Sequence, residues 1–177
     1  MSGSHPRMSY EAFGAQAGAV QAALRAISKA IEDSGLEKDL TELVKLRVSQ
    51  INGCAFCVQI HLNFARRLAV PAAKLDLVAA WREAGVFSDR ECAALAWAEV
   101  LTALAPGAAS DADYAALLRC FTESEAMHLT VAIAAINAWN RIGVAMRFAP
   151  PIPALSRDGA WTSESAAAVP LRSQAAK

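Results

Sequence analysis

The chain has 177 residues, of which 55% are hydrophobic and 7% are aromatic, with 17 basic and 17 acidic side chains. One domain with its own core is the default at this length, and the scarcity of aromatic and β-branched residues favours an all-α fold. Because the charges balance, the protein has no net positive charge that would favour binding to nucleic acid or to an anionic membrane.

The ends of the chain differ in composition from its middle. Residues 1–9 are predicted to be a leader or disordered, with Met8 as the expected native start, and residues 10–149 to form one helical domain. Residues 150–177, rich in Pro, Ala and Ser, are predicted to be a tail. We find no apolar run near the roughly 20 residues that span a bilayer and no signal-peptide pattern, so we expect a cytoplasmic protein with no membrane partner.

Apolar positions recur at spacings of three and four along most of the chain, which is typical of helices. They predict about six to eight helices, over residues 10–34, 36–51, 54–68, 72–84, 88–105, 110–121 and 125–148. Asn52 and Gly53 tolerate left-handed backbone and should separate the second helix from the third. Ser88 and Glu91 have the spacing of a capping box. The last helix is apolar nearly all round, so it should be central or buried at a subunit contact.

The third predicted helix starts with the residues most informative about function. Cys54, Cys57 and His61 are spaced three and four residues apart and should share one helix face. A helix N-terminus and a neighbouring imidazole both lower a cysteine pKa, so this spacing supplies an attacking sulfur, a resolving sulfur and a proton acceptor. Glu42, if the turn at residues 52–53 brings it close, would raise the basicity of His61 and fix its tautomer.

Either cysteine could be the attacking one. The helix dipole favours Cys54, whereas His61, four residues further on, favours Cys57. We favour Cys57, because an imidazole in contact can take the proton outright, while an exposed helix terminus supplies only about 0.3 to 1 kcal/mol.

Other readings of these residues stay open. A metal site could use Cys54, Cys57 and His61 with a distant fourth ligand, but no second pair of ligands follows at short spacing, so we expect neither a metal nor a cofactor. The two thiols could also be buried by chance, and Glu42 could be a solvated carboxylate.

Several polar and aromatic residues outside this cluster have two interpretations. Ser49 could join the relay or bond its own helix carbonyl, and the second reading is the expected one. His128 is expected to be a surface or packing residue, and Trp139 a core or interface aromatic. Asn140 and Arg141 are expected to hydrogen-bond or pair across a subunit contact, which is a structural role.

Residues 42–57 (ELVKLRVSQINGCAFC) followed by His61 resemble the core motif of the alkylhydroperoxidase (AhpD)-like branch of the carboxymuconolactone decarboxylase family. Residues 136–142 (INAWNRI) resemble a second segment of that branch, so the similarity covers most of residues 36–148. The resemblance implies an all-helical, AhpD-like bundle that assembles as a homo-oligomer, commonly a trimer or hexamer.

The resemblance also implies a thiol peroxidase or disulfide reductase. Cys57 would be the peroxidatic thiol, Cys54 the resolving thiol, His61 the neighbouring base and Glu42 the acid at the far end of a proton relay. Phe56 stands where the best-known members have a further histidine, so the relay is shorter here. The expected partners are a hydroperoxide substrate and an external dithiol reductant, either a lipoylated or a thioredoxin-like protein.

Two other functions are compatible with the sequence. The family name suggests decarboxylation of a carboxylated lactone, which needs no redox pair and would leave the CxxC motif unexplained. A non-enzymatic oligomer could instead use the cysteines as a redox sensor, and such a protein would be oxidised once and then stop.

Overall fold

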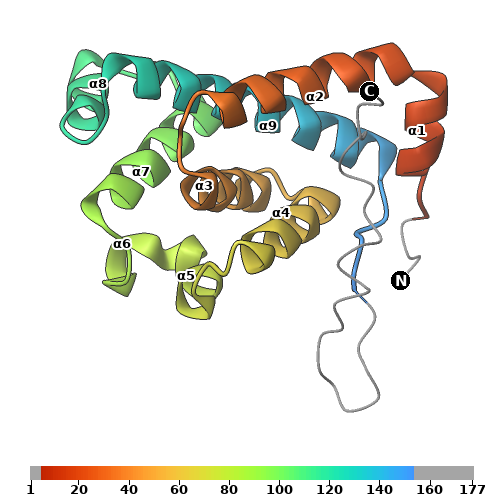
Figure 1. Ribbon diagram of the computed structural model, residues 1–177, viewed down its shortest axis with the longest axis horizontal. Coiled ribbons are helices and arrows are strands. Elements are labelled where there is room, and N and C mark those ends of the chain that lie inside the picture. The colour runs from red at the N-terminus through yellow and green to blue at the C-terminus, as the bar shows by residue number, and fades with distance from the viewer. Residues whose placement is uncertain (1–4, 154–177) are drawn as a thin grey trace.

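The computed structural model describes residues 5–153 and shows an all-α protein, as predicted (Figure 1). No strand occurs in this part of the chain. Its helices are α1 (Tyr10–Gln16), α2 (Gly18–Asp33), α3 (Lys38–Ile51), α4 (Ala55–Arg67), α5 (Ala72–Leu77), a 3-10 turn (Val78–Ala80), α6 (Trp81–Ala84), α7 (Asp89–Ala103), α8 (Asp111–Leu118) and α9 (Glu123–Met146). Parts of the predicted leader, residues 1–4, and of the predicted tail, residues 154–177, lie outside the described residues.

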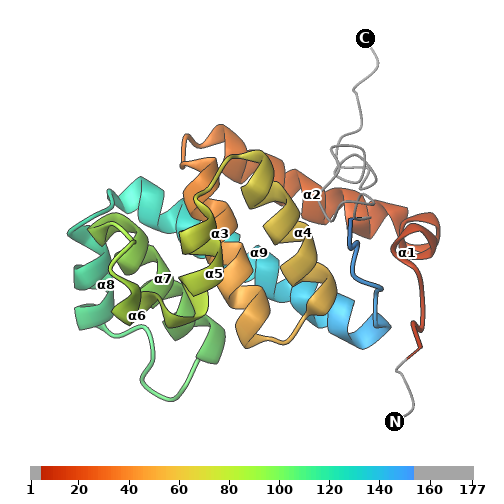
Figure 2. The same ribbon diagram turned by 90° about the horizontal axis from the view of Figure 1, so that it is seen from below.

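Helix α3 is at the centre of the bundle. It packs against α4, α7 and α9. Helix α2 lies along α9, on the side of α9 that faces away from α3 (Figures 1 and 2). One buried cluster joins α3, α4, α7 and α9, and a second lies where α3 meets the segment from α5 to α7. The α3–α4 hairpin, which carries the CxxC motif, is therefore held by core packing on both sides.

The turn between α3 and α4 forms as predicted. Helix α3 ends at Ile51, and Gly53 follows with a φ of 65°, a backbone region that favours glycine. The Cys54 N–H then donates to the Ser49 carbonyl at 3.0 Å, which closes the turn. Helix α4 starts at Ala55 with Cys54 as its N-cap.

The first predicted helix is two helices. Ala17, with φ −126° and ψ 39°, separates α1 from α2. The bend lets Tyr10 and Phe13 pack against Phe148, at ring-centroid distances of 5.6 and 5.8 Å, while α2 follows α9. The apolar spacing continues across Ala17, so periodicity alone could not reveal this break.

The predicted helix over residues 72–84 is also interrupted. Leu75, Val78 and Trp81 are buried at spacings of three, the period of a 3-10 helix, and the chain takes a 3-10 turn between α5 and α6. Downstream, the predicted capping box of Ser88 and Glu91 is confirmed.

Helix α9 packs against α2, α3, α4, α7 and α8, in agreement with the burial that its composition predicts, and it begins at Glu123 rather than Glu125. Thr122 caps it with a capping box. Contrary to our expectation from the sequence, its length and composition would allow it to cross a membrane. Its small and polar residues, including Asn137, Asn140 and Gly143, are buried against other helices, which is the pattern of a core helix.

Candidate active site

Cys54 and Cys57 form a disulfide at the start of α4, with their Cα atoms 5.3 Å apart. Cys54 occupies the N-cap position, and its Sγ accepts a hydrogen bond of 3.3 Å from the Cys57 N–H. The sulfur thus takes the part that a serine hydroxyl plays at an ordinary N-cap. Both side chains are nearly buried, with 1% of Cys54 and 4% of Cys57 exposed.

His61 and Glu42 contact one another across the α3–α4 hairpin. The His61 Nδ1–H donates to Glu42 Oε2 at 2.6 Å, and the Lys45 Nζ donates to Glu42 Oε1 at 2.9 Å. Burial acts to raise the pKa of Glu42, but the adjacent His61 and Lys45 outweigh it and lower this pKa to about 2. Glu42 is therefore a buried, paired carboxylate, and the interpretation of it as a solvated side chain is wrong.

The contact with Glu42 decides which nitrogen of the His61 ring carries the proton. Because the carboxylate accepts from Nδ1, that nitrogen carries a proton and Nε2 remains for chemistry. Within the described residues no hydrogen bond joins the ring to either sulfur. The sequence analysis did not identify Lys45 as a partner of Glu42. Its position three residues after Glu42 on the same helix could have indicated this pair.

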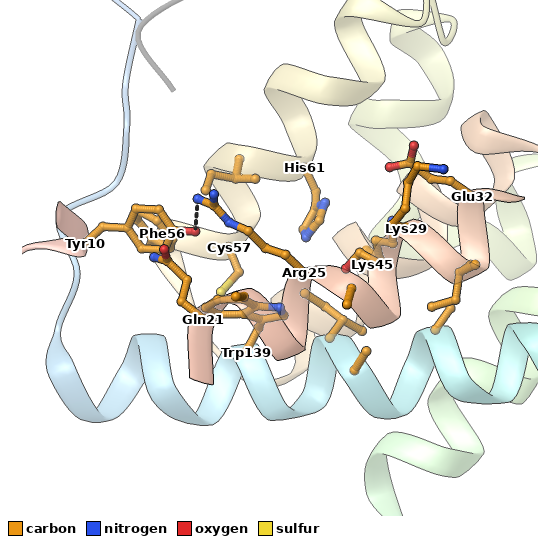
Figure 3. A pocket seen from close by; sticks show the side chains of 18 of the residues that line it. Tyr10, Gln21, Arg25, Lys29, Glu32, Lys45, Phe56, Cys57, His61 and Trp139 are labelled. Carbon is orange, nitrogen blue, oxygen red and sulfur yellow. Dashed lines mark hydrogen bonds between the residues drawn. The ribbon is translucent and has the colours of Figure 1, made fainter. Parts of the chain in front are cut away.

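A cavity of about 710 Å³ lies between α2 on one side and α4 and α9 on the other (Figure 3). Cys57 and His61 both line this cavity, and Figure 3 shows both side chains pointing into it, whereas Cys54 is not among its lining residues. The volume lies within the range of about 300–1,000 Å³ that is usual for small-molecule sites. The arrangement places one sulfur of the redox pair and one imidazole at the wall of a ligand-sized space.

The comparisons with known proteins agree with this geometry. Residues 18–100 match the model of the carboxymuconolactone decarboxylase family. The uncharacterized protein YdfG of Bacillus subtilis is 34% identical over 120 residues, which are 68% of this chain and 82% of that protein. The chain belongs to the carboxymuconolactone decarboxylase family.

Solved structures indicate the branch of this family. A protein of unknown function from Agrobacterium tumefaciens, named as a candidate AhpD antioxidant defence protein, is 36% identical, with a TM-score of 0.78 over 84% of this chain and 99% of that one. A peroxidase-related protein from Ralstonia eutropha, described as an alkylhydroperoxidase AhpD core, is 25% identical, with a TM-score of 0.70 over 84% and 78% of the two chains. The resemblance to the AhpD-like branch is thereby confirmed.

Phe56, which replaces the histidine found between the cysteines of the best-known AhpD proteins, forms part of the apolar wall of the cavity. Its ring packs against Tyr10 and Phe148, at centroid distances of 5.0 and 5.2 Å. Trp139, expected to be a core or interface aromatic, also lines the cavity. The site of this AhpD-like protein therefore combines one imidazole with an aromatic wall.

Gly143 of α9 was not singled out in the sequence, yet it lies directly against the sulfurs. A Cβ at this position would be 2.8 Å from Cys54 Sγ and 3.3 Å from Cys57 Sγ. Only a glycine lets the α9 backbone approach the disulfide this closely. A glycine in the last turn of a long apolar helix, before its C-cap, was the signal available in the sequence.

A buried polar network anchors the turn that precedes Cys54. The Asn52 amide donates to Asn137 Oδ1 and Asn140 Oδ1, both at 2.9 Å, and the Asn140 amide donates to Ser49 Oγ at 3.0 Å. The Ser49 hydroxyl donates to the Lys45 carbonyl at 2.7 Å, as expected from the sequence. The network fixes α9 to the α3–α4 turn. Asn140 thus has a structural role, as expected, but its partners Asn52 and Ser49 belong to the same chain and not to a subunit contact.

The other two cysteines are free thiols that lie apart from the CxxC motif. Cys92 lies in α7 and Cys120 follows α8. Burial, with Asp89 and Glu91 nearby, raises the pKa of the Cys92 thiol, which opposes formation of a reactive thiolate. Across residues 5–153, no three His, Cys, Asp or Glu side chains gather closely enough to hold a metal ion.

Proposed function

We propose that this protein is a thiol-dependent hydroperoxide reductase in antioxidant defence, re-reduced by an external dithiol. One observation carries the proposal: a sulfur of a redox-capable cysteine pair and an imidazole held by a buried carboxylate line the same cavity. The AhpD and peroxidase names of the similar structures support the same class of chemistry.

The reaction begins with the reduced pair. The Cys57 thiolate attacks the terminal peroxide oxygen, so an S–O bond forms, the O–O bond breaks and the alkoxide leaves with a proton from His61 as an alcohol. Cys57 is now a sulfenic acid. The Cys54 thiolate attacks this sulfur, hydroxide leaves and is protonated to water, and the disulfide forms. The hydroperoxide has gained two electrons and the cysteine pair has lost them.

The position of each sulfur supports the assignment of Cys57 as the attacking thiol. Cys57 lines the cavity, whereas Cys54 lies at the N-cap against Gly143. A peroxide in the cavity would therefore meet Cys57 first. Cys54 is suited to the resolving step instead. The Cys57 N–H that donates to Cys54 Sγ, together with the positive end of α4, favours a thiolate on Cys54.

This arrangement also suits the return to the reduced state. The thiolate of an external dithiol attacks Cys57, Cys54 leaves as a stabilised thiolate, and the second thiol of the donor then releases Cys57. A lipoylated or thioredoxin-like protein is the proposed donor. Two thiols form on this chain while the donor becomes a disulfide, so the electrons balance.

His61 moves the protons in this scheme, and Glu42 acts through it as a positioning residue. The Glu42 carboxylate holds Nδ1 protonated, so Nε2 faces the chemistry. Since the ring makes no hydrogen bond to either sulfur among the described residues, we propose that the proton passes through a water molecule or through the peroxide itself.

The homo-oligomer expected from the family is part of the proposal, as is a cytoplasmic location. Two exposed apolar side chains one turn apart on α9, Met127 and Val131, support an interface there. Reduced thiols and a protein dithiol donor are both supplied by the cytosol.

The test is steady-state consumption of hydroperoxide with a dithiol donor by cysteine variants. Cys57→Ser should abolish consumption, and Cys54→Ser should permit one turnover and then stall. The matched controls Cys92→Ser and Cys120→Ser should keep multiple turnover. Sulfenic acid trapped on Cys54 rather than Cys57 would reverse the assignment, and one stoichiometric oxidation of the native protein without turnover would indicate a sensor instead of an enzyme.

A further inference from the structure

The wall of the cavity that holds the redox pair carries three ionisable side chains. Cys57 and His61 come from α4, and Lys45 comes from α3. Of the described residues, the others that α3, α4 and α9 contribute to this wall are apolar or aromatic, namely Phe56, Ile60, Ala132, Ala135, Ile136 and Trp139. In the proposed reaction the sulfur attacks and the imidazole moves protons, so the Lys45 ammonium is the ionisable group at this wall that has no role.

Lys45 is held beside His61 by a carboxylate that the two residues share. Its Nζ donates to Glu42 Oε1 at 2.9 Å, while the His61 Nδ1–H donates to Glu42 Oε2 at 2.6 Å. Glu42 is not among the residues that line the cavity, so it lies behind its two partners, and both reach the cavity past it. Figure 3 shows Lys45 and His61 at the same cavity. The ammonium and the imidazole are therefore neighbouring groups that face one space.

The Lys45 ammonium is largely buried and has hydrogen-bond donors available for a ligand. Only 13% of its side chain is exposed, and Glu42, whose pKa is lowered to about 2, compensates its charge. An ammonium has three N–H donors, and within the described residues Glu42 accepts from one of them. A fixed donor in such a partly desolvated site stabilises a developing negative charge more than a donor in water does.

We propose that Lys45 is a further catalytic residue, whose ammonium donates a hydrogen bond to the leaving oxygen of the hydroperoxide. The inference rests on the proposed function and deepens it. As the Cys57 thiolate forms an S–O bond with the terminal oxygen, the O–O bond breaks and its electron pair stays on the oxygen that carries the alkyl group. The Lys45 ammonium stabilises this developing alkoxide and keeps its own proton, and His61 supplies the proton that completes the alcohol.

The test compares two oxidants that differ in their leaving group. Ethyl hydroperoxide and peracetic acid both have two carbons and a terminal peroxide oxygen, but the first releases ethoxide and the second releases acetate, a far weaker base. Each is mixed with reduced protein in which Cys92 and Cys120 are replaced by serine, and the rate constant for loss of the CxxC thiols is measured in a single turnover. Lys45→Met should slow oxidation by ethyl hydroperoxide about tenfold to a hundredfold, the range of a charge-assisted hydrogen bond, and oxidation by peracetic acid less than about threefold.

Two further variants control for charge and for folding. Lys45→Arg keeps a cationic donor and should retain part of the rate with ethyl hydroperoxide. Lys74→Met is the matched control, because Lys74 is also largely buried and pairs with Glu91 at 2.6 Å but does not line the cavity, so both rate constants should stay unchanged. The ratio of the two rate constants within one variant does not depend on the fraction of protein that is folded.

A double-mutant cycle separates a direct contact from an effect that passes through Glu42 and His61. If the ammonium touches the leaving oxygen, Lys45→Met should still slow ethyl hydroperoxide selectively in a His61→Gln background. The absence of any further loss in that background would overturn the inference, as would equal losses with the two oxidants. Either result would leave the proposed function standing, because the wild type would still reduce the hydroperoxide. If ethyl hydroperoxide oxidised the wild type no faster than a free thiol, the proposed function would fail, and this inference with it.

Discussion

Replacing Gly143 with alanine is expected to destabilise the oxidised protein. The new Cβ would lie 2.8 Å from Cys54 Sγ, a separation that real Cβ atoms essentially never show, and 3.3 Å from Cys57 Sγ. The sulfurs cannot move apart independently because they are bonded to each other. Helix α9 cannot readily retreat either, since the Asn140 network holds it against the turn before Cys54.

Two opposing effects set the size of this change. Overpacking a core costs about 1–3 kcal/mol, whereas alanine in place of glycine inside a helix stabilises by about 1 kcal/mol. The expected net result is a loss of up to about 2 kcal/mol in the free energy of unfolding. Gly18 of α2 is the matched control, because a Cβ there would meet nothing within 4 Å, so Gly18→Ala should not destabilise the protein.

Urea unfolding of the oxidised proteins measures both variants. A double-mutant cycle then tests the cause, because Cys54→Ala removes the sulfur nearest the new methyl group and should reduce the penalty of Gly143→Ala. The reasoning would be refuted if Gly143→Ala stabilised the protein, or if its effect were the same with and without the Cys54 sulfur.

Three other variants test the rest of the site. Because the pKa of Glu42 is lowered from 4.5 to about 2, its contribution, on the order of 3 kcal/mol, is full above pH 4.5 and is lost as the pH falls toward 2. Glu42→Gln should lack this loss in acid unfolding curves, and parallel curves for both proteins would contradict the assignment. Asn140→Ala should lower the unfolding free energy by about 1–3 kcal/mol, measured in urea, because it leaves buried partners such as Ser49 unsatisfied; an unchanged midpoint would argue against the network. His61→Gln should slow peroxide consumption and shift the pH–rate profile upward, because the thiol must then ionise unaided. His128→Gln is its control, since the His128 ring bonds the Ser124 carbonyl of its own helix, and an unchanged profile for His61→Gln would remove that residue from the mechanism.

The sequence by itself determined the features that depend on near neighbours in the chain. The apolar spacing identified the helices, and the capping pair of Ser88 and Glu91 located the start of one of them, because a cap acts within one helical turn. The break at Gly53 and the short distance from Cys54 to Cys57 have the same local origin. The interruption at Ala17 was missed because it serves the distant packing of Phe13 against Phe148, which no local pattern records.

Only the tertiary structure decided how these pieces meet. Glu42 and His61 are 19 residues apart, and their contact exists because α3 and α4 fold against each other. Which of the two sulfurs reaches the cavity wall depends on where α2 and α9 pass the hairpin, as does the close approach of Gly143 to the disulfide. Side chains far apart in sequence share a cavity only after the core has packed. Residue spacing therefore predicts that the two cysteines and the imidazole lie close together, but it cannot predict the cavity beside them.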